Sequence, residues 1–149
     1  MLKEGQVVKD FSLKDSEGKL HKLSDYMGKK VVIYFYPKDD TPGCTKEACA
    51  FRDDFKKYEG KKAVIIGISA ENENSHKKFK EKYGLPFVLL CDPEKHVINE
   101  FGALKNSFLG KKYSGIRRST FIVDENGKLI KVFPDVSVEG HSEEILSCL

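Results

Sequence analysis

The stretch VVIYFYPKDDTPGC, residues 31–44, places a cysteine at the start of a helix directly after a buried strand. Its first six residues are apolar and rich in β-branched and aromatic side chains, which is typical of a central strand. Pro37 ends that strand, and Thr41 with Pro42 predicts the N-cap and first residue of a helix. Cys44 then falls at about the third helical residue, where free N–H groups and the helix dipole favour a thiolate. The segment therefore predicts a nucleophilic cysteine.

The chain on either side of this stretch alternates between strands and helices. Apolar runs predict buried strands over 63–68 and 87–91. Helical periodicity and turn residues predict helices over 42–58, 73–83 and 94–101.

The two ends of the chain add hairpins to this pattern. Residues 11–23 predict a short hairpin, and residues 120–133 predict a second one turned at Asn126-Gly127, followed by a helix from about Ser142. Such an order predicts an α/β, thioredoxin-like fold, in which a central mixed sheet is flanked by helices and extended by an N-terminal β-hairpin.

Length and composition indicate an ordinary globular protein. With 149 residues, of which 40% are hydrophobic and 33% charged, we expect a single domain over 1–149. No apolar run approaches the ~20 residues of a membrane span, and the N-terminus lacks the apolar stretch of a secretory signal. We therefore expect a cytoplasmic protein without a membrane partner.

The net charge of +3 is spread over interleaved acidic and basic residues, with one exception. No acidic residue occurs from Phe101 to Val123. We interpret this segment as an exposed basic loop, because no nucleic-acid-binding motif accompanies it. Its basic residues are Lys105, Lys111, Lys112, Arg117 and Arg118.

The four cysteines are Cys44, Cys49, Cys91 and Cys148. The close pair is C-x4-C rather than the C-x2-C of zinc sites, and the four histidines are scattered, so we expect no metal. Cys91 ends an apolar run and is expected to be an inert core thiol. Cys148 lies next to the last residue and is expected to be exposed and open to reaction. Burial as a small apolar residue is the alternative reading of Cys44.

The chain resembles the peroxiredoxins, and within them the Q-type subfamily, also called bacterioferritin comigratory protein. Pro37, Thr41 and Cys44 match the peroxiredoxin motif Pro-x-x-x-Thr-x-x-Cys. The similarity extends over most of the chain, including YPKDDTPGCTKEAC at 36–49, GIRRSTFIVD at 115–124 and the closing Gly140-His141.

This resemblance implies a role for each residue of the motif. Cys44 would be the peroxidatic nucleophile, and Arg118 would hold its thiolate and polarise the peroxide, for which a permanent guanidinium charge is suited. Thr41 would hydrogen-bond the same oxygens, Pro37 would shield the sulfur, and Glu47 would orient the arginine. The alternative for Arg118 is a surface arginine like its neighbour Arg117. No metal, haem, flavin or other cofactor is implied.

The resemblance also implies that Cys49 resolves the oxidised Cys44 as a disulfide. Five helical residues rise ~7.5 Å, whereas Cα atoms joined by a disulfide lie at most ~6.8 Å apart. The first turns of the helix would therefore have to unwind in each cycle. Alternatively, Cys49 is a packed helix residue and the resolving thiol comes from elsewhere.

The resemblance implies a thiol-dependent peroxidase that reduces hydrogen peroxide and small organic hydroperoxides and is recycled by thioredoxin or a similar dithiol. Two alternatives are a general thiol–disulfide oxidoreductase and a peroxide sensor that passes oxidation to a partner protein. A resolving cysteine in the same chain removes the chemical need for a second subunit, so we expect a monomer.

Overall fold

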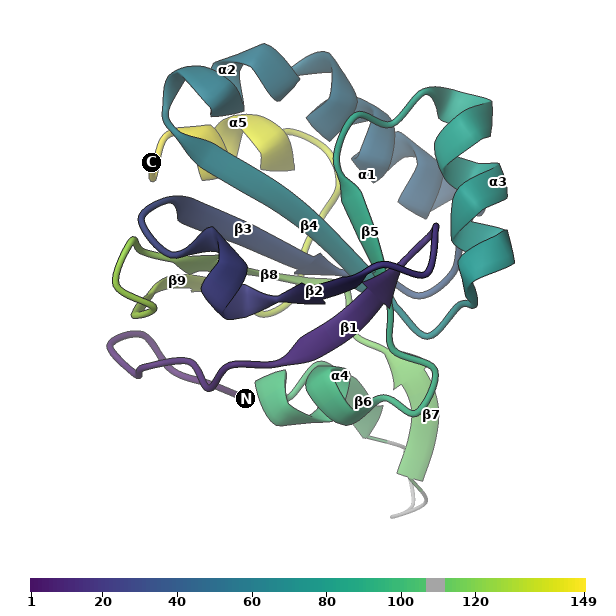
Figure 1. The fold of residues 1–149 in the computed structure, drawn as a ribbon, viewed down its shortest axis with the longest axis horizontal. Helices are drawn as coiled ribbons and strands as arrows, with labels where there is room; N and C mark the ends of the chain where they lie inside the picture. Colours follow the sequence, from purple (N-terminus) through teal and green to yellow (C-terminus); the bar gives the residue numbers. More distant parts are fainter. Residues whose placement is uncertain (107–111) are drawn as a thin grey trace.

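A computed structural model describes residues 1–106 and 112–149 of the chain, and a seven-stranded mixed sheet forms its centre (Figure 1). In sheet order the strands are β2 (Leu20–Lys22), β1 (Ser12–Asp15), β5 (Val88–Cys91), β4 (Ala63–Ser69), β3 (Lys30–Phe35), β8 (Ser119–Val123) and β9 (Leu129–Phe133). β3 pairs in parallel with β4 and antiparallel with β8, which confirms the central position predicted from its apolar run.

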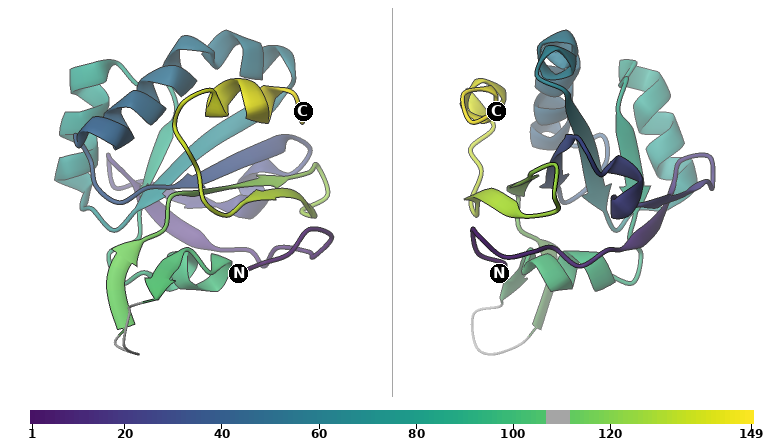
Figure 2. Two further views of the ribbon diagram at one scale, coloured as in Figure 1. Left: turned by 180° about the vertical axis from the view of Figure 1, so that it is seen from behind. Right: turned by 60° about the vertical axis from the view of Figure 1, so that its left-hand side comes forward.

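Helices cover both faces of the sheet (Figures 1 and 2). They are the 3-10 helix η1 (Leu23–Tyr26) and the α-helices α1 (Pro42–Asp53), α2 (Phe55–Gly60), α3 (Glu73–Tyr83), α4 (His96–Phe101) and α5 (His141–Leu146). α1, α2, α3 and α5 lie on one face, where they bury Val32 and Tyr34 of β3. α4 lies on the other face, packed in the cluster that contains Ile33 and Phe35. β3 is thus buried on both sides, as a central strand of such a sheet must be.

The N-terminal hairpin was predicted from the sequence and is present. β1 pairs antiparallel with β2 and also with β5, so the hairpin extends the sheet beyond β5. The second predicted hairpin is β8 and β9, which pair antiparallel across a turn at 124–128.

The predicted single helix over 42–58 is wrong in one respect, because Asp54 divides it into α1 and α2. The Asp54 carboxylate accepts a hydrogen bond of 2.7 Å from the Ser142 hydroxyl on α5. The Tyr58 hydroxyl lies 3.0 Å from the same Ser142 oxygen. The break at Asp54 therefore coincides with contacts to α5. It was not predicted because no proline or glycine marks it in the sequence.

The predicted basic loop is also partly wrong. β6 (Leu104–Asn106) and β7 (Lys112–Ile116) pair antiparallel as a separate two-stranded sheet. Lys111, one of the basic residues of that expectation, lies outside the described residues. Neither strand is a continuous apolar run, so the sequence pattern did not reveal the pairing.

No helix in the described part of the chain is long and apolar enough to cross a membrane. The described residues also contain no cluster of histidine, cysteine and carboxylate side chains that could hold a metal ion.

Gly67 of β4 leaves the space that the Tyr34 ring occupies. A Cβ at Gly67 would lie 2.8 Å from Tyr34 Cζ and 2.8 Å from Leu89 Cδ2. We expect Gly67→Ala to lower the free energy of unfolding by about 1–3 kcal/mol through overpacking, as measured by urea denaturation. Gly60→Ala is the matched control, because outside its own helix and chain neighbours no atom lies within 4 Å of the added Cβ. Equal unfolding midpoints for Gly67→Ala and the unmodified protein would contradict this account of the packing.

Candidate active site

Cys44 lies at the third residue of α1, where the sequence placed it. Thr41 is the extended N-cap residue, with φ −92° and ψ 156°, and Pro42 is the first helical residue. The side chain of Thr41 makes no capping hydrogen bond to the helix. Its hydroxyl instead donates to the carbonyl of Lys38 at 2.8 Å. The helix start is therefore confirmed, whereas the Thr41 hydroxyl is held on the preceding turn.

Arg118 reaches Cys44 from the position just before β8. Ser119, the first residue of β8, pairs with Phe35, the last residue of β3. Arg118 therefore lies beside the end of β3, close to where α1 begins. Its Nη2 donates to Cys44 Sγ at 3.4 Å, and its Nη1 donates to Glu47 Oε1 at 2.8 Å. One guanidinium thus contacts both the buried thiol and a buried carboxylate.

The glycine before Cys44 leaves room for this guanidinium. A Cβ at Gly43 would lie 3.1 Å from Arg118 Nη2, closer than nearly all real Cβ contacts. A side chain at position 43 would require the guanidinium to shift by a few tenths of an ångström.

Glu47 is the buried partner of Arg118, with 2% of its surface exposed. Burial raises the pKa of Glu47 to about 7, although the charge and hydrogen bond of Arg118 oppose this shift. Its second oxygen, Oε2, and the Tyr34 hydroxyl are buried without a hydrogen-bond partner in the described part of the protein. Burial, and then the charge of Glu47, raise the pKa of Tyr34.

The adjacent Arg117 points elsewhere. Its Nε lies 3.6 Å from Asp135 Oδ1, a carboxylate with an exposed side chain. The structure therefore brings Arg118, and not Arg117, to the cysteine.

The remaining predicted site residues lie at the edges of this arrangement. Pro37 follows β3 and is exposed. Cys49 is a half-buried free thiol on the same unbroken helix as Cys44. Cys148 is exposed, and its thiol donates to the carbonyl of Glu144 at 3.4 Å.

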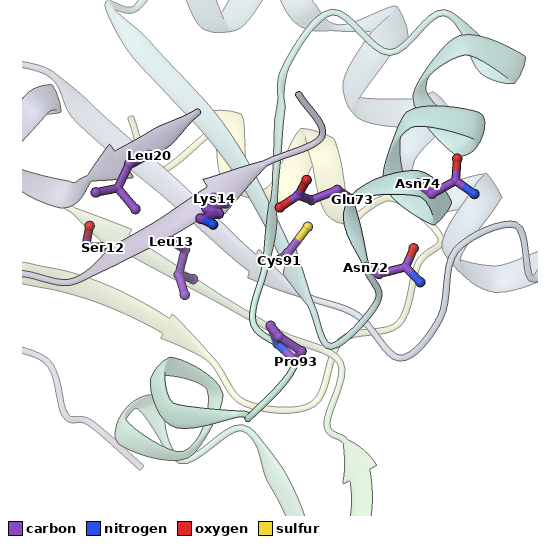
Figure 3. A pocket seen from close by; sticks show the side chains of 9 residues that line it. All are labelled: Ser12, Leu13, Lys14, Leu20, Asn72, Glu73, Asn74, Cys91 and Pro93. Atoms are coloured by element: carbon purple, nitrogen blue, oxygen red, sulfur yellow. The ribbon is translucent and has the colours of Figure 1, made fainter. Parts of the chain in front are cut away.

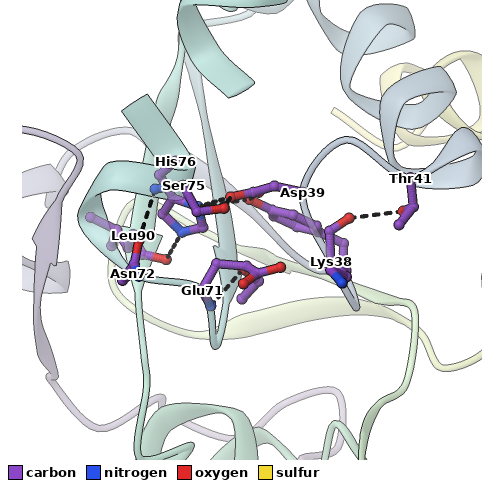
Figure 4. Close-up of polar contacts among 10 residues, drawn as sticks. Lys38, Asp39, Thr41, Glu71, Asn72, Ser75, His76 and Leu90 are labelled. Carbon is purple, nitrogen blue, oxygen red and sulfur yellow. Dashed lines mark hydrogen bonds and ion pairs between the residues drawn. The ribbon is translucent and has the colours of Figure 1, made fainter. Parts of the chain in front are cut away.

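A buried ion pair next to the site was missed by the sequence reasoning (Figure 4). His76 of α3 is fully buried; its Nδ1 lies 2.7 Å from Asp39 Oδ2 and its Nε2 lies 2.9 Å from the carbonyl oxygen of Leu90. Both ring nitrogens face acceptors, so both carry protons. Burial lowers the pKa of His76, but the hydrogen bond and charge of Asp39, together with Cys91, raise it to about 10. The one available signal was the position of His76, three residues before Phe79 on the apolar face of its helix.

A cavity of about 650 Å³ lies elsewhere, between the N-terminal hairpin and the start of α3 (Figure 3). Cys91 lines it and is 6% exposed. Cys44 is not among the residues that line this cavity, which are Ser12, Leu13, Lys14, Leu20, Asn72, Glu73, Asn74, Cys91 and Pro93. The cavity is therefore separate from the Cys44 site.

Comparison with known proteins gives consistent matches along the chain. Residues 5–132 match the AhpC/TSA family. The chain is 50% identical over 147 residues to peroxiredoxin Bcp of Bacillus subtilis, covering 97% of this chain and 93% of that one. It is 48% identical over 147 residues to the putative peroxiredoxin bcp of Coxiella burnetii, covering 97% of each.

Solved structures agree with these sequence matches. A cysteine-to-serine mutant of Xylella fastidiosa PrxQ superposes with a TM-score of 0.93 at 30% identity, covering 99% of this chain and 95% of that one. The Xanthomonas campestris bacterioferritin comigratory protein superposes with a TM-score of 0.87 at 34% identity, covering 93% and 88%. These similarities confirm the predicted thioredoxin-like fold with its central mixed sheet. The chain belongs to the AhpC/TSA family and is a Q-type (Bcp) peroxiredoxin, a thiol-dependent peroxidase.

Proposed function

We propose that Cys44 is the peroxidatic cysteine and that Cys49 resolves it, with a dithiol such as thioredoxin completing the cycle. The observation that carries the proposal is the guanidinium of Arg118, which donates to Cys44 Sγ at 3.4 Å while Glu47 holds its other arm. The substrates are hydrogen peroxide and small organic hydroperoxides.

In the first step the Cys44 thiolate attacks one oxygen of the hydroperoxide. An S–O bond forms and the O–O bond breaks, so the sulfur becomes a sulfenic acid and the departing RO⁻ takes a proton to leave as water or alcohol. Negative charge moves from the sulfur to the leaving oxygen. Arg118 stabilises it along this path, because its charge is permanent and its position is fixed before the reaction begins.

Two residues complete the proposed peroxide site. The Thr41 hydroxyl donates its proton to the Lys38 carbonyl, so its oxygen retains lone pairs that can accept the peroxide O–H. Pro37 is exposed between β3 and α1, and its ring would limit access of water to the sulfur. Glu47 acts through Arg118 as a positioning residue.

In the second step the Cys49 thiol attacks the sulfenic sulfur of Cys44. An S–S bond forms, the S–O bond breaks, and the hydroxyl leaves as water. On intact α1 the two residues are separated by a rise of ~7.5 Å, so the first turns must unwind before the bond can form. A dithiol then reduces the disulfide and is itself oxidised. Because both cysteines belong to one chain, we further propose that a monomer completes the cycle.

The two cysteines should respond differently to substitution. Cys44→Ser should abolish peroxide consumption, because it removes the nucleophile. Cys49→Ser should retain one turnover and lose cycling with thioredoxin, because the sulfenic acid still forms but is not resolved. Stopped-flow peroxide consumption with thioredoxin as the sole donor measures both. Unchanged steady-state turnover in Cys49→Ser would refute its resolving role, and rapid reduction of insulin by the unmodified protein would favour a general thiol–disulfide oxidoreductase.

The two neighbouring arginines should also differ. Arg118→Ala should slow the reaction with peroxide by ~10²–10³-fold, the usual cost of removing one fixed charge-stabilising donor. Arg117→Ala is the matched control and should have little effect, because its side chain faces Asp135. The second-order rate constant of the reduced protein with hydrogen peroxide distinguishes them. A larger loss in Arg117→Ala would reverse the assignment.

Oxidation should unwind the start of α1. Amide hydrogen exchange between Thr45 and Phe51 should be slow in the reduced protein and faster in the disulfide form, because the bond does not fit the intact helix. The comparison requires mass-spectrometric proof of the Cys44–Cys49 bond. Equal protection in both forms would exclude unwinding, and a bond from Cys44 to Cys91 or Cys148 would assign resolution to another thiol.

A further inference from the structure

The segment 37–41 has to serve two states of the helix that follows it. It carries Thr41 and Pro37, which the proposed function places around the peroxide. It also joins directly to the turns of α1 that unwind for the disulfide. Contacts that hold the segment 37–41 in place therefore affect both the reaction with peroxide and the formation of the disulfide. This inference rests on the proposed function.

Asp39 turns inward from an otherwise exposed segment. Pro37, Lys38 and Asp40 are exposed, whereas Asp39 is 7% exposed. Its Oδ1 accepts from the Tyr36 hydroxyl at 2.6 Å. Its Oδ2 accepts from the Ser75 hydroxyl and from His76 Nδ1, each at 2.7 Å (Figure 4). Both carboxylate oxygens are thus satisfied, and two of the three donors belong to α3.

His76 supplies the compensating charge. Its ring is enclosed by Asp39, the Leu90 carbonyl, Cys91 and the Tyr36 hydroxyl, which lies 3.4 Å from Nδ1. Removing either member of such a buried pair leaves an uncompensated charge, which is far more costly than breaking an exposed pair. Both partners are therefore needed to hold the segment on α3.

Three further hydrogen bonds join α3 to residues on either side of the first turns of α1. Asp40 has a positive φ of 58°, and its carboxylate accepts from Lys82 Nζ at 2.8 Å and from the Tyr83 hydroxyl at 2.6 Å. Farther along α1, Arg52 Nη1 donates to the carbonyl of Tyr83 at 2.8 Å. The turns that carry Cys44 and Cys49 lie between these attachments.

We propose that Asp39 and His76 are positioning residues that anchor the segment before α1 onto α3, favouring the wound helix that reacts with peroxide and confining unwinding to the turns between Thr41 and Arg52. When the Asp39–His76 contact is lost, the N-cap residue Thr41 and the strained Asp40 are free to move, so the first turn of α1 is no longer held in place. The balance then moves from the wound towards the unwound helix.

This balance decides the fate of the sulfenic acid. In the wound helix it can meet a second peroxide, in which case another S–O bond forms, the O–O bond breaks, and the products are a sulfinic acid and water or alcohol. In the unwound helix it condenses with Cys49 to the disulfide and water. The ratio of sulfinic acid to disulfide therefore reports the helix equilibrium separately from overall stability.

The experiment is to treat reduced protein with a series of hydrogen peroxide concentrations and no reductant, and to measure both products of Cys44 by mass spectrometry. Asp39→Asn should lower the sulfinic-to-disulfide ratio about tenfold, the scale expected for one charge-assisted hydrogen bond. It should also slow the first reaction with peroxide. Ser75→Ala keeps both charges and removes one bond to Asp39, so it should lower the ratio in the same direction by a smaller factor.

Tyr58→Phe is the control for general destabilisation. It removes a buried hydroxyl that contacts Ser142, away from segment 37–41, and should leave the ratio unchanged. An unchanged or increased ratio in Asp39→Asn would overturn the anchor, and if that variant does not fold, Ser75→Ala decides in the same way. Absence of a Cys44–Cys49 disulfide in the unmodified protein would instead refute the proposed function, and the anchor with it.

Discussion

Several features of the fold fix the position of the Arg118 guanidinium, and the chemistry that we propose for Cys44 depends on this position. It lies between the buried sulfur and the buried carboxylate of Glu47, contacting both. The pairing of β8 with β3 brings Arg118 to this edge of the sheet, and Gly43 leaves the space for it. Without this cation, two groups that can carry negative charge would be buried together, an arrangement that a protein interior does not tolerate.

A second constraint opposes this one. The site requires the first turns of α1 to be wound, because they hold Cys44 and Glu47 against Arg118. The proposed disulfide requires the same turns to open, because the rise between the two cysteines exceeds what an S–S bond spans. If the start of α1 were too stable, the disulfide would form slowly. If it were too unstable, Cys44 and Glu47 would move away from Arg118. In the proposed cycle, the local stability of the start of α1 therefore affects function as well as packing.

Features encoded within a few neighbouring residues could be predicted from the sequence. The strand, the proline after it and the helix start place Cys44 correctly, and the Asn-Gly turn places the second hairpin. Features made by distant residues could not. The break at Asp54 accompanies contacts with α5, and the pairing of β6 with β7 joins polar strands. Arg118 was predicted only from the family resemblance. No local sequence pattern links Asp39 to His76, which lies thirty-seven residues away.

The buried pair of Asp39 and His76, which the sequence did not predict, is better explained by positioning than by stability. Replacing a buried ion pair by well-packed apolar residues is often neutral or stabilising, so stability alone does not explain one. A carboxylate that accepts three hydrogen bonds does, however, fix the backbone that bears it in one place. Burial lowers the pKa of His76, but Asp39 and Cys91 raise it above its ordinary value, which favours the charged ring. Burial also raises the pKa of Glu47, which lies in the first turns of α1, to about 7. The structure thus pairs a buried ion pair before the helix with a carboxyl group inside its first turns whose pKa burial raises.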